Sequence, residues 1–308
     1  MKELIRIGTR GSKLAIAQSM WVKEQIESKY SNIRVELVKI KTKGDKILDS
    51  PLSKIGGKGL FVKEIENALL REEIDLAVHS IKDVPFDLPE GLEIPVYPKR
   101  ENPLDAFISC SFSRIEEIPD GAKIGTSSLR RQVQIKRLKR GVKIVPIRGN
   151  VDTRLEKLKK ENLDGIVLAV AGLKRLGLCK EITQILPEEL MLPAIGQGAL
   201  GIEIRTDDLK MKRLLSFLNH TETEICIKAE RSFLKELGGG CQVPVAGHAS
   251  IKKDKLQIKG IISDLKAQRF LKESLVGDIK EPEAVGKRLA ERLLKKGAEQ
   301  ILKEVYHG

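Results

Sequence analysis

The feature that most constrains the fold of this chain is a pattern of strands and helices that recurs once along the sequence. Short runs of β-branched residues alternate with segments of helical periodicity, which is typical of α/β proteins. Three strand-like runs are echoed in the same order further on: Ile5–Thr9 by Ala122–Thr126, Val35–Ile40 by Val142–Ile147, and Ile74–Val78 by Leu163–Ala169. Single matches between short strands are common, but three in the same order favour a duplicated α/β lobe.

Helices are expected between these strands, each opened by a serine: Ser12 in the first copy, and Ser127 or Ser128 in the second. The first helix is predicted over Ser12–Glu27, and a later one over Leu60–Leu70. The periodicity of the first helix predicts the following buried face: Leu14, Ile16, Ala17, Met20, Trp21 and Val22.

Prolines mark the expected crossings between the lobes, because proline restricts both itself and its predecessor. The first crossing contains Pro95, Pro98 and Pro103, and Pro193 precedes the second. The strand-like run Leu200–Arg205 is expected to return to the first lobe. The predicted domains are therefore residues 1–98 with 199–217, residues 104–192, and residues 220–308.

After Asn219 the pattern changes to that of a small α+β domain with an antiparallel sheet. Thr221-x-x-Glu224 predicts a capping box for a helix that continues to Leu237. Three strands and a final helix follow, predicted over Val243–Ile251, Lys255–Ser263, Arg269–Val276 and Pro282–Val305.

The chain carries a basic excess, with 56 Lys and Arg against 43 Asp and Glu, and this favours an anionic partner. Nucleic acid is disfavoured, because aromatic residues make up only 4% of the chain and the basic residues are spread along its whole length. The sequence shows neither an N-terminal secretory signal nor a run of about 18 apolar residues, so no membrane partner is expected.

The four cysteines, Cys110, Cys179, Cys226 and Cys241, lie far apart and form no C-x-x-C pair. This spacing argues against a structural zinc site and against a disulfide framework, so we expect no metal. The expected compartment is the reducing cytoplasm.

Basic and hydroxyl side chains follow the predicted strands in both lobes, where α/β proteins bind their ligands. They are Arg10, Ser12, Ser80, Lys82, Thr126, Ser127, Ser128, Arg130, Arg131, Arg148, Arg154, Lys174 and Arg175. An isolated arginine usually pairs with a neighbouring acid, but several at equivalent strand ends favour a ligand with carboxylates or phosphates. A nucleotide is disfavoured, because the sequence has no Walker pattern and no G-x-G-x-x-G opening a helix.

One acid, Asp83, stands among these cations. It is either an ion-pair partner of a neighbouring cation or a carboxylate that stabilises a developing positive charge or moves a proton. His79, at the end of the preceding strand, could act as a base but is more often a structural residue in such a position.

Cys241 follows three glycines, which leave room around its thiol. It is either a reactive thiol or an attachment point for a prosthetic group. The segment Lys41–Gly59 is rich in glycine and lysine, which is typical of either a lid or a disordered loop.

Taken together, these motifs resemble the porphobilinogen deaminase (hydroxymethylbilane synthase) family over essentially the whole chain. The residues that carry the resemblance are Ile7-Gly-Thr-Arg10-Gly-Ser12-x-Leu14-Ala15, Gly56-Gly-Lys58-Gly-Leu-Phe61, His79-Ser-x-Lys82-Asp83-Val-Pro85, Gly125-Thr-Ser-Ser128-Leu-Arg130-Arg131, Arg148-Gly-Asn150-Val-x-Thr153-Arg154, Pro193-Ala-x-Gly-Gln197-Gly-Ala199 and Gly239-Gly-Cys241-x-x-Pro244. Any one of these motifs is weak, whereas seven in the right order are highly specific.

The resemblance implies two lobes like those of type II periplasmic binding proteins, followed by the small third domain. It also implies a dipyrromethane primer attached to Cys241, to which four porphobilinogen molecules are joined head to tail with loss of ammonia. A final hydrolysis then releases hydroxymethylbilane. Such an enzyme is expected to be a monomer.

The resemblance assigns Asp83 as the catalytic residue. It assigns the following residues to the cofactor: Cys241, Lys82, Asp83, Ser128, Arg130 and Arg131. It assigns the following residues to the substrate: Arg10, Ser12, Arg148, Arg154 and Arg175. Lys54 and Lys58 fall in the predicted lid.

The main rival is a small-anion binding module on the same two-lobed scaffold, because a fold alone does not fix a function. The lack of a secretory signal argues against a solute receptor. A third domain carrying Gly-Gly-Gly-Cys241 would also have no role in such a receptor.

Overall fold

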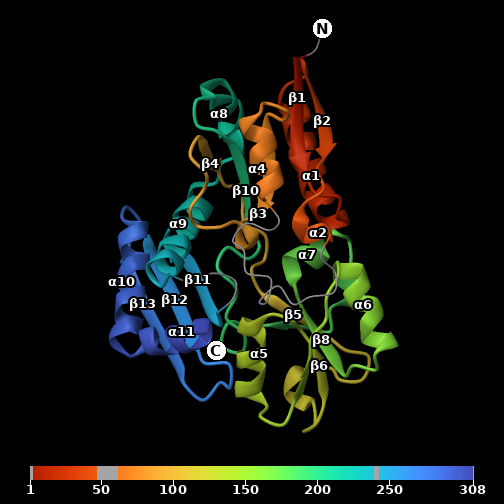
Figure 1. Ribbon diagram of the computed structural model, residues 1–308, viewed down its shortest axis with the longest axis vertical. Coiled ribbons are helices and arrows are strands. Elements are labelled where there is room, and N and C mark those ends of the chain that lie inside the picture. The colour runs from red at the N-terminus through yellow and green to blue at the C-terminus, as the bar shows by residue number, and fades with distance from the viewer. Residues whose placement is uncertain (1–2, 47–61, 239–242, 308) are drawn as a thin grey trace.

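The first lobe is built on a five-stranded sheet with the order β2-β1-β3-β10-β4 (Figure 1). The computed structural model describes residues 3–46, 62–238 and 243–307. The strands of this sheet are β1 (Glu3–Thr9), β2 (Ile33–Lys39), β3 (Leu76–Ser80), β4 (Leu92–Val96) and β10 (Leu200–Arg205). β1 runs parallel to β2 and β3, whereas β10 is antiparallel to β3 and β4.

The second lobe repeats this arrangement in a sheet with the order β7-β6-β8-β5-β9. Its strands are β5 (Asp105–Ile108), β6 (Lys123–Gly125), β7 (Lys143–Val145), β8 (Gly165–Ala169) and β9 (Gln184–Leu186). β6 is parallel to β7 and β8, and β5 is antiparallel to β8 and β9. The predicted recurrence of three strands is confirmed, because β6, β7 and β8 take the places of β1, β2 and β3.

Helices flank both sheets. Those of the first lobe are α1 (Lys13–Lys29), α2 (Lys43–Lys46), α4 (Lys63–Leu70) and α8 (Leu209–Leu215), with short 3-10 turns η1 (Ile81–Asp83) and η4 (Ser216–Leu218). Those of the second lobe are α5 (Leu129–Leu138), α6 (Val151–Lys160) and α7 (Val170–Arg175), with η2 (Ile115–Glu117) and η3 (Cys179–Glu181). An ion pair of 2.7 Å between Lys13 and Asp152 joins α1 to α6 across the lobes.

The predicted buried face of α1 is wrong in part. Met20 and Trp21 are 38% and 40% exposed, whereas the polar residues Gln18 and Ser19 are buried. The helix does not pack on the sheet alone, because its N-terminal half lies against the second lobe. Gln18 is therefore buried beside Ser80, to whose hydroxyl its amide donates a hydrogen bond of 2.9 Å.

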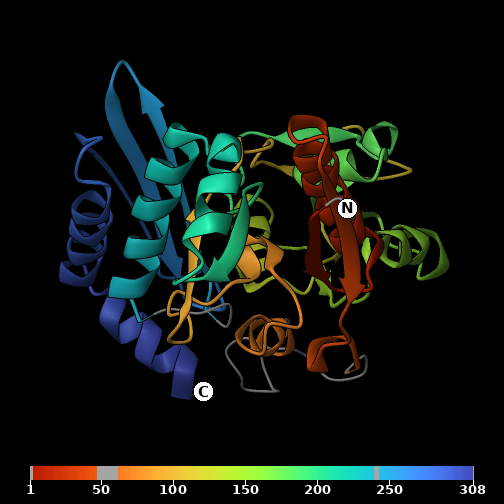
Figure 2. The same ribbon diagram turned by 90° about the horizontal axis from the view of Figure 1, so that it is seen from above.

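The third unit is an antiparallel sheet with the order β11-β12-β13, packed against helices. Its elements are α9 (Thr221–Glu236), β11 (Val245–Lys252), β12 (Lys255–Ser263), β13 (Phe270–Asp278), α10 (Pro282–Lys295) and α11 (Ala298–His307). Figure 2 shows these teal and blue elements on the side of the molecule opposite the N-terminal strand. The expected fold class, two α/β lobes and a small α+β unit, is confirmed.

Two predicted details of the third unit are wrong. The helix cap is not Thr221, because the ring of His220 accepts the hydrogen bond from the backbone N–H of Thr223. The final helix is two helices rather than one. They are separated at Gly297, whose φ of +94° is incompatible with a continuing α-helix.

Buried Glu230 of α9 fixes the third unit to the segments that cross between the lobes. Its carboxylate pairs with Arg100 of the first crossing at 2.6 Å and accepts the backbone N–H of Gly196 of the second crossing at 2.6 Å. It also accepts the N–H of Ala249 in β11. One carboxylate thus links both crossings to the third sheet.

Candidate active site

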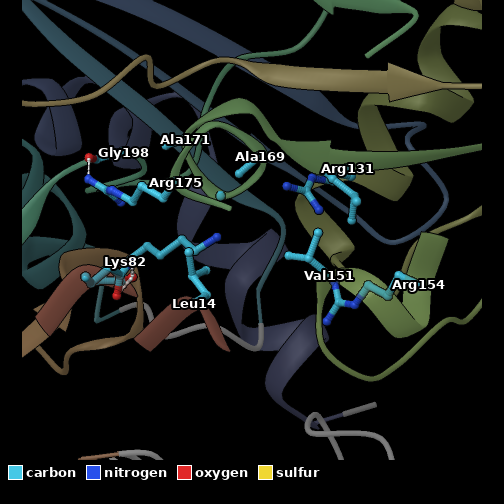
Figure 3. Close-up of a pocket in the computed structure, with 13 residues that line it drawn as sticks. Leu14, Lys82, Arg131, Val151, Arg154, Ala169, Ala171, Arg175 and Gly198 are labelled. Atoms are coloured by element: carbon cyan, nitrogen blue, oxygen red, sulfur yellow. Dashed lines mark hydrogen bonds between the residues drawn. The ribbon is translucent and has the colours of Figure 1, made fainter. Parts of the chain in front are cut away.

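A pocket lies between the two lobes, at the carboxyl ends of their strands (Figure 3). The first lobe contributes Ser80, the last residue of β3, and Lys82, which lies two residues further on. The second lobe contributes Arg131 of α5, Arg154 of α6 and Arg175 of α7. The remaining lining is Leu14, Gln18, Val151, Leu168, Ala169, Ala171, Gly172 and Gly198. Cations from both lobes therefore converge on one cleft that also has apolar walls.

Asp83 lines a second, adjoining pocket in the first lobe, together with Arg10, His79 and Ser80. Gln18 and Ser80 line both pockets, so the two form neighbouring parts of one cleft. Asp83 ends the short turn η1 and is exposed, which leaves its carboxylate accessible from the cleft.

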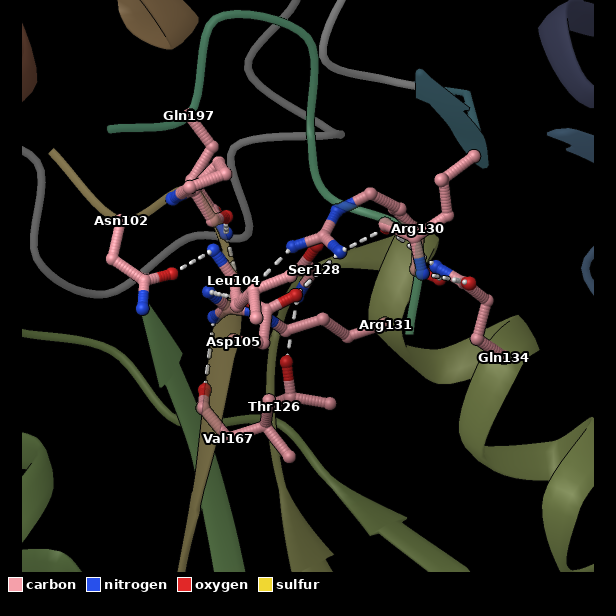
Figure 4. A network of polar contacts seen from close by, with 12 residues as sticks. Asn102, Leu104, Asp105, Thr126, Ser128, Arg130, Arg131, Gln134, Val167 and Gln197 are labelled. Carbon is pink, nitrogen blue, oxygen red and sulfur yellow. Dashed lines mark hydrogen bonds and ion pairs between the residues drawn. The ribbon is translucent and has the colours of Figure 1, made fainter. Parts of the chain in front are cut away.

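Arg130 and Arg131 are buried, and both guanidinium groups pair with one carboxylate, that of Asp105 (Figure 4). Arg130 Nη1 lies 2.6 Å from Oδ2 of Asp105, and Arg131 Nη2 lies 2.7 Å from Oδ1. Gln197 of the second crossing donates a further hydrogen bond of 3.0 Å to Oδ1. The backbone carbonyls of Leu192 and Val167 accept from the two arginines.

This network uses much of the hydrogen-bonding capacity of the two arginines inside the protein. The adjacent guanidinium groups hold the pKa of Asp105 well below its usual range, although burial opposes them. Burial lowers the pKa of Arg131. Sequence reasoning missed Asp105. The available signal was an acid at the first position of an otherwise apolar strand, Asp105–Ile108.

The other cations of the cleft are half-buried and held by backbone carbonyls. Arg154 Nε donates to the carbonyl of Gly149 at 2.9 Å, and Arg175 Nη2 donates to that of Gly198 at 2.8 Å. Burial lowers the pKa of each arginine to about 10, so both remain charged at neutral pH. Burial also lowers the pKa of Lys82, an effect that Arg131 reinforces and Asp83 opposes.

The remaining predicted residues lie outside the lining of these two pockets. Ser12 caps α1, its hydroxyl accepting from the N–H of Ala15 at 3.2 Å. Ser128 precedes α5, and Arg148 follows β7 as a half-buried side chain. Lys54, Lys58 and Cys241 lie outside the described residues.

The part of the chain that the structure describes contains three free cysteines and no metal-binding group. Cys110 and Cys179 are exposed, and Cys226 is buried. Burial raises the pKa of the Cys226 thiol to about 12, which makes it a poor nucleophile. Residues 3–46, 62–238 and 243–307 contain no group of three side chains suited to hold a metal. None of the described helices is long and apolar enough to cross a membrane.

Comparison with protein families accounts for nearly all of this architecture. Residues 5–213, which comprise both lobes, match the model described as "Porphobilinogen deaminase, dipyromethane cofactor binding domain". Residues 224–295 match the C-terminal domain of the same protein. The chain belongs to the porphobilinogen deaminase family. It is thus an enzyme that catalyses a transferase-type reaction with porphobilinogen as substrate and dipyrromethane as cofactor.

Two sequence relatives support this assignment. The porphobilinogen deaminases of Geobacter metallireducens and Geobacter sulfurreducens are each 52% identical over 302 residues, which cover 98% of this chain and 95% of theirs. Among solved structures, the chain is similar to the methionine binding protein MetQ, at 15% identity and a TM-score of 0.45 over 69% of this chain and 89% of that one. It is also similar to the aliphatic sulphonate binding protein SsuA of Escherichia coli, at 12% identity and a TM-score of 0.40, over 76% of this chain and 70% of that one.

The cofactor-binding match to porphobilinogen deaminase contains every cation that lines the cleft. Cys241 instead falls within the part of the sequence that matches the C-terminal domain, five positions after Glu236, the last residue of α9.

Proposed function

We propose that this chain forms hydroxymethylbilane from four porphobilinogen molecules, joined head to tail on a dipyrromethane attached to Cys241 and released by hydrolysis. When bound, the dipyrromethane supplies the pyrrole carbon to which the first unit is joined. The observation that carries the proposal is the convergence of cations from both lobes on one cleft beside Asp83.

The residues of the cleft fit such a group and its product. Each pyrrole unit carries an acetate and a propionate, so negative charge accumulates as the chain lengthens. Arg154 and Arg175 present charged guanidinium groups, which bind carboxylates in bidentate geometry. Leu14 and Val151 supply apolar walls for the flat pyrrole rings.

Asp83 acts as the catalytic residue in this proposal. Positive charge develops on the pyrrole as ammonia leaves, and a fixed carboxylate stabilises that charge as it forms. The oxygens of Asp83 also accept hydrogen bonds from pyrrole N–H groups and assist the proton transfers that accompany ammonia loss and final deprotonation.

Replacement of Asp83 tests this role. Asp83→Asn keeps the shape and removes the charge, so it should lower kcat at least roughly a hundredfold while leaving the thermal unfolding temperature unchanged. Asp83→Glu should retain more activity than Asp83→Asn. Asp87→Asn is a matched control, because Asp87 is an exposed neighbour that forms a surface ion pair with Lys235. An Asp83→Asn protein that carries its cofactor and turns over at the parental rate would remove Asp83 from the mechanism.

The attachment at Cys241 is tested by intact mass. We expect the purified protein to exceed its sequence mass by one dipyrromethane, located on the peptide that contains Cys241. Cys241→Ser should lose this addition, whereas Cys226→Ser should keep it, since that thiol is buried. A fully active protein of unmodified mass would contradict the attachment.

The arginines are expected to differ in role. Arg130 and Arg131 are assigned to the cofactor, so their replacement by leucine should prevent cofactor assembly. Replacement of Arg154 or Arg175 by leucine should leave the cofactor in place and stall later additions. Native mass spectrometry of the bound chain length separates these outcomes. Lower thermal stability with normal turnover in every variant would show that the arginines are structural only.

The proposal also places the enzyme in the cytoplasm as a monomer. Size-exclusion chromatography with light scattering should give one species near 34.3 kDa plus the cofactor. A stable species of twice that mass would contradict the monomer.

A further inference from the structure

One face of α9, a helix of the third unit, packs against the first lobe beside the turn that ends at Asp83 (Figure 1). Ile227, Arg231 and Lys235 are spaced four residues apart and therefore share this face. All three meet the segment of residues 81–87. Ile227 does so in an apolar cluster, Arg231 through hydrogen bonds, and Lys235 through a surface ion pair.

Arg231 binds the backbone that directly follows Asp83. Its Nη2 donates to the carbonyl of Pro85 at 2.7 Å and to that of Phe86 at 3.0 Å, and its Nη1 makes a longer hydrogen bond of 3.4 Å to the carbonyl of Val84. These three residues belong to neither a helix nor a strand. One rigid guanidinium group therefore fixes the direction of three consecutive carbonyls in a segment that no regular element holds.

The other end of the turn is held by the second crossing between the lobes. The backbone N–H of Ile81 donates to the carbonyl of Ala199 at 3.1 Å, and the Ile81 side chain is buried. Asp83 itself is exposed, so packing of its own side chain contributes little to its position. Its place depends instead on the backbone contacts before it, at Ile81, and after it, at Arg231.

The donors of Arg231 serve this backbone rather than a carboxylate. Within the residues that the structure describes, the half-buried Arg231 forms no ion pair, and it lines neither of the two pockets. Its removal would thus leave no carboxylate buried without its cation, in contrast to the removal of Arg130 or Arg131 from Asp105. A variant that lacks the guanidinium group is therefore expected to fold.

We propose that Arg231 is a positioning residue for Asp83, which it keeps in place through the carbonyls of residues 84–86 while positive charge develops on the substrate. The inference rests on the proposed catalytic role of Asp83. The cations proposed to hold the substrate, Arg154 and Arg175, lie in the second lobe. The loss of Arg231 should therefore change kcat more than KM.

The first test compares Arg231→Met with the parent holoenzyme. Methionine keeps an unbranched apolar side chain and removes the donors, so kcat should fall about tenfold to a hundredfold, the scale of a displacement of roughly 1 Å at a catalytic group. KM should change by less than about threefold. Arg231→Lys keeps a charged donor, and its kcat should lie between those of Arg231→Met and the parent. An Arg231→Met or Arg231→Lys protein with a raised KM and the parental kcat would overturn the inference.

Arg205→Met is the matched control. Arg205 likewise donates to backbone carbonyls of the first lobe, those of Leu69 and Ile74, at 3.0 and 2.9 Å. It lies at the far end of β10, because Leu200 is the residue of that strand that pairs with Ser80. Arg205→Met should lower the unfolding temperature and keep kcat within about twofold of the parent. Equal losses of kcat in the two methionine variants would show that Arg231 is structural only.

A double-mutant cycle tests whether Arg231 acts through Asp83. Once the carboxylate is absent, its position no longer matters, so Asp83→Asn with Arg231→Met should turn over within about threefold of Asp83→Asn alone. A larger further loss in the double variant would show that Arg231 acts independently of Asp83, and would overturn the inference.

Two measurements do not depend on activity. Hydrogen exchange in the peptide that spans residues 81–88 should be faster in Arg231→Met than in the parent, and unchanged in Arg205→Met. Intact mass should show the cofactor in Arg231→Met, although α9 ends five positions before Cys241. Unchanged exchange in Arg231→Met, or a protein without its cofactor, would overturn the inference.

The outcomes also separate this inference from the proposed function. If Asp83→Asn is slow while Arg231→Met turns over at the parental rate, the inference fails and the proposed site stands. If Asp83→Asn itself turns over at the parental rate, the proposed role of Asp83 is wrong, and the inference falls with it.

Discussion

Asp105→Asn should destabilise the protein strongly, although Asp105 contacts neither pocket. The carboxylate is 0% exposed and is the shared partner of two guanidinium groups, themselves only 6% and 7% exposed in their side chains. Asparagine keeps one acceptor oxygen but turns an amide donor toward the arginines. Both positive charges would then lie buried without a compensating carboxylate.

The size of the effect follows from the burial of the partners. Removing one member of a buried ion pair costs about 3–5 kcal/mol, because the remaining charge is left uncompensated. In a protein of this size, 1 kcal/mol corresponds to roughly 2–4 °C. We therefore expect the thermal unfolding temperature to fall by roughly 6–20 °C at pH 7.5. Asp207→Asn, which neutralises an exposed aspartate, should change it by less than about 2 °C.

The assay is urea unfolding and calorimetry of both variants, followed by measurement of cofactor content. Because Asp105 orients Arg130 and Arg131, the surviving folded Asp105→Asn protein should also carry less cofactor than the control. The pKa of Asp105 is held below its usual range, so the contribution of this carboxylate to the free energy of unfolding is present above pH 3.8 and is lost as the pH falls further. If Asp105→Asn lowers the free energy of unfolding by less than about 1 kcal/mol, this carboxylate does not hold the arginine pair.

Three further predictions concern single residues. Burial raises the pKa of Glu66 from 4.5 to about 7, so the free energy of unfolding should fall as the pH rises from 4.5 through 7. In urea unfolding, Glu66→Gln should therefore be up to roughly 3 kcal/mol more stable than the parent at pH 8 and equal to it near pH 4.5. The pKa of Glu188 is shifted in the opposite direction, because hydrogen bonds from His248 and Lys259 lower it to about 2. Glu188→Gln should therefore lower the free energy of unfolding by about 1–3 kcal/mol at pH 7, and the difference should vanish as the pH falls through 2. Gly198→Ala should raise KM and lower the unfolding temperature by several degrees, because Gly198 has a φ of +87° and an added Cβ would clash with the carbonyl oxygen of Glu101. For each of these three variants, unchanged values would contradict the contact on which its prediction depends.

The order of the strands could be predicted from the sequence, because each strand is a short apolar run with its own local signal. The position of the cations at strand ends followed from the same pattern. What could not be predicted were contacts set by the packing of one lobe on another. Met20 and Trp21 fit the apolar periodicity of α1 but are exposed, since that helix faces the cleft rather than a single sheet.

The same limit applies to the site. Arg131 lines the larger pocket, but Asp105, the partner of Arg130 and Arg131, lies more than 20 residues earlier, in a strand with no polar pattern of its own. His79 of β3 and Glu203 of β10 form a buried pair although they lie 124 residues apart along the chain. No periodicity relates such positions, because they become neighbours only when β10 is inserted into the first sheet.

The place of β10 in that sheet has a consequence for synthesis on the ribosome. β10 lies between β3 and β4 and joins them into one sheet, so β4 is not linked to the rest of the sheet until residues 200–205 have been made. The second sheet uses only strands between residues 105 and 186 and is complete earlier. The lobe that emerges second can therefore finish folding first, while β3 and β4 of the N-terminal lobe keep open edges that are prone to aggregation. A fragment of residues 1–195 should be resistant to protease in the second lobe and sensitive in the first.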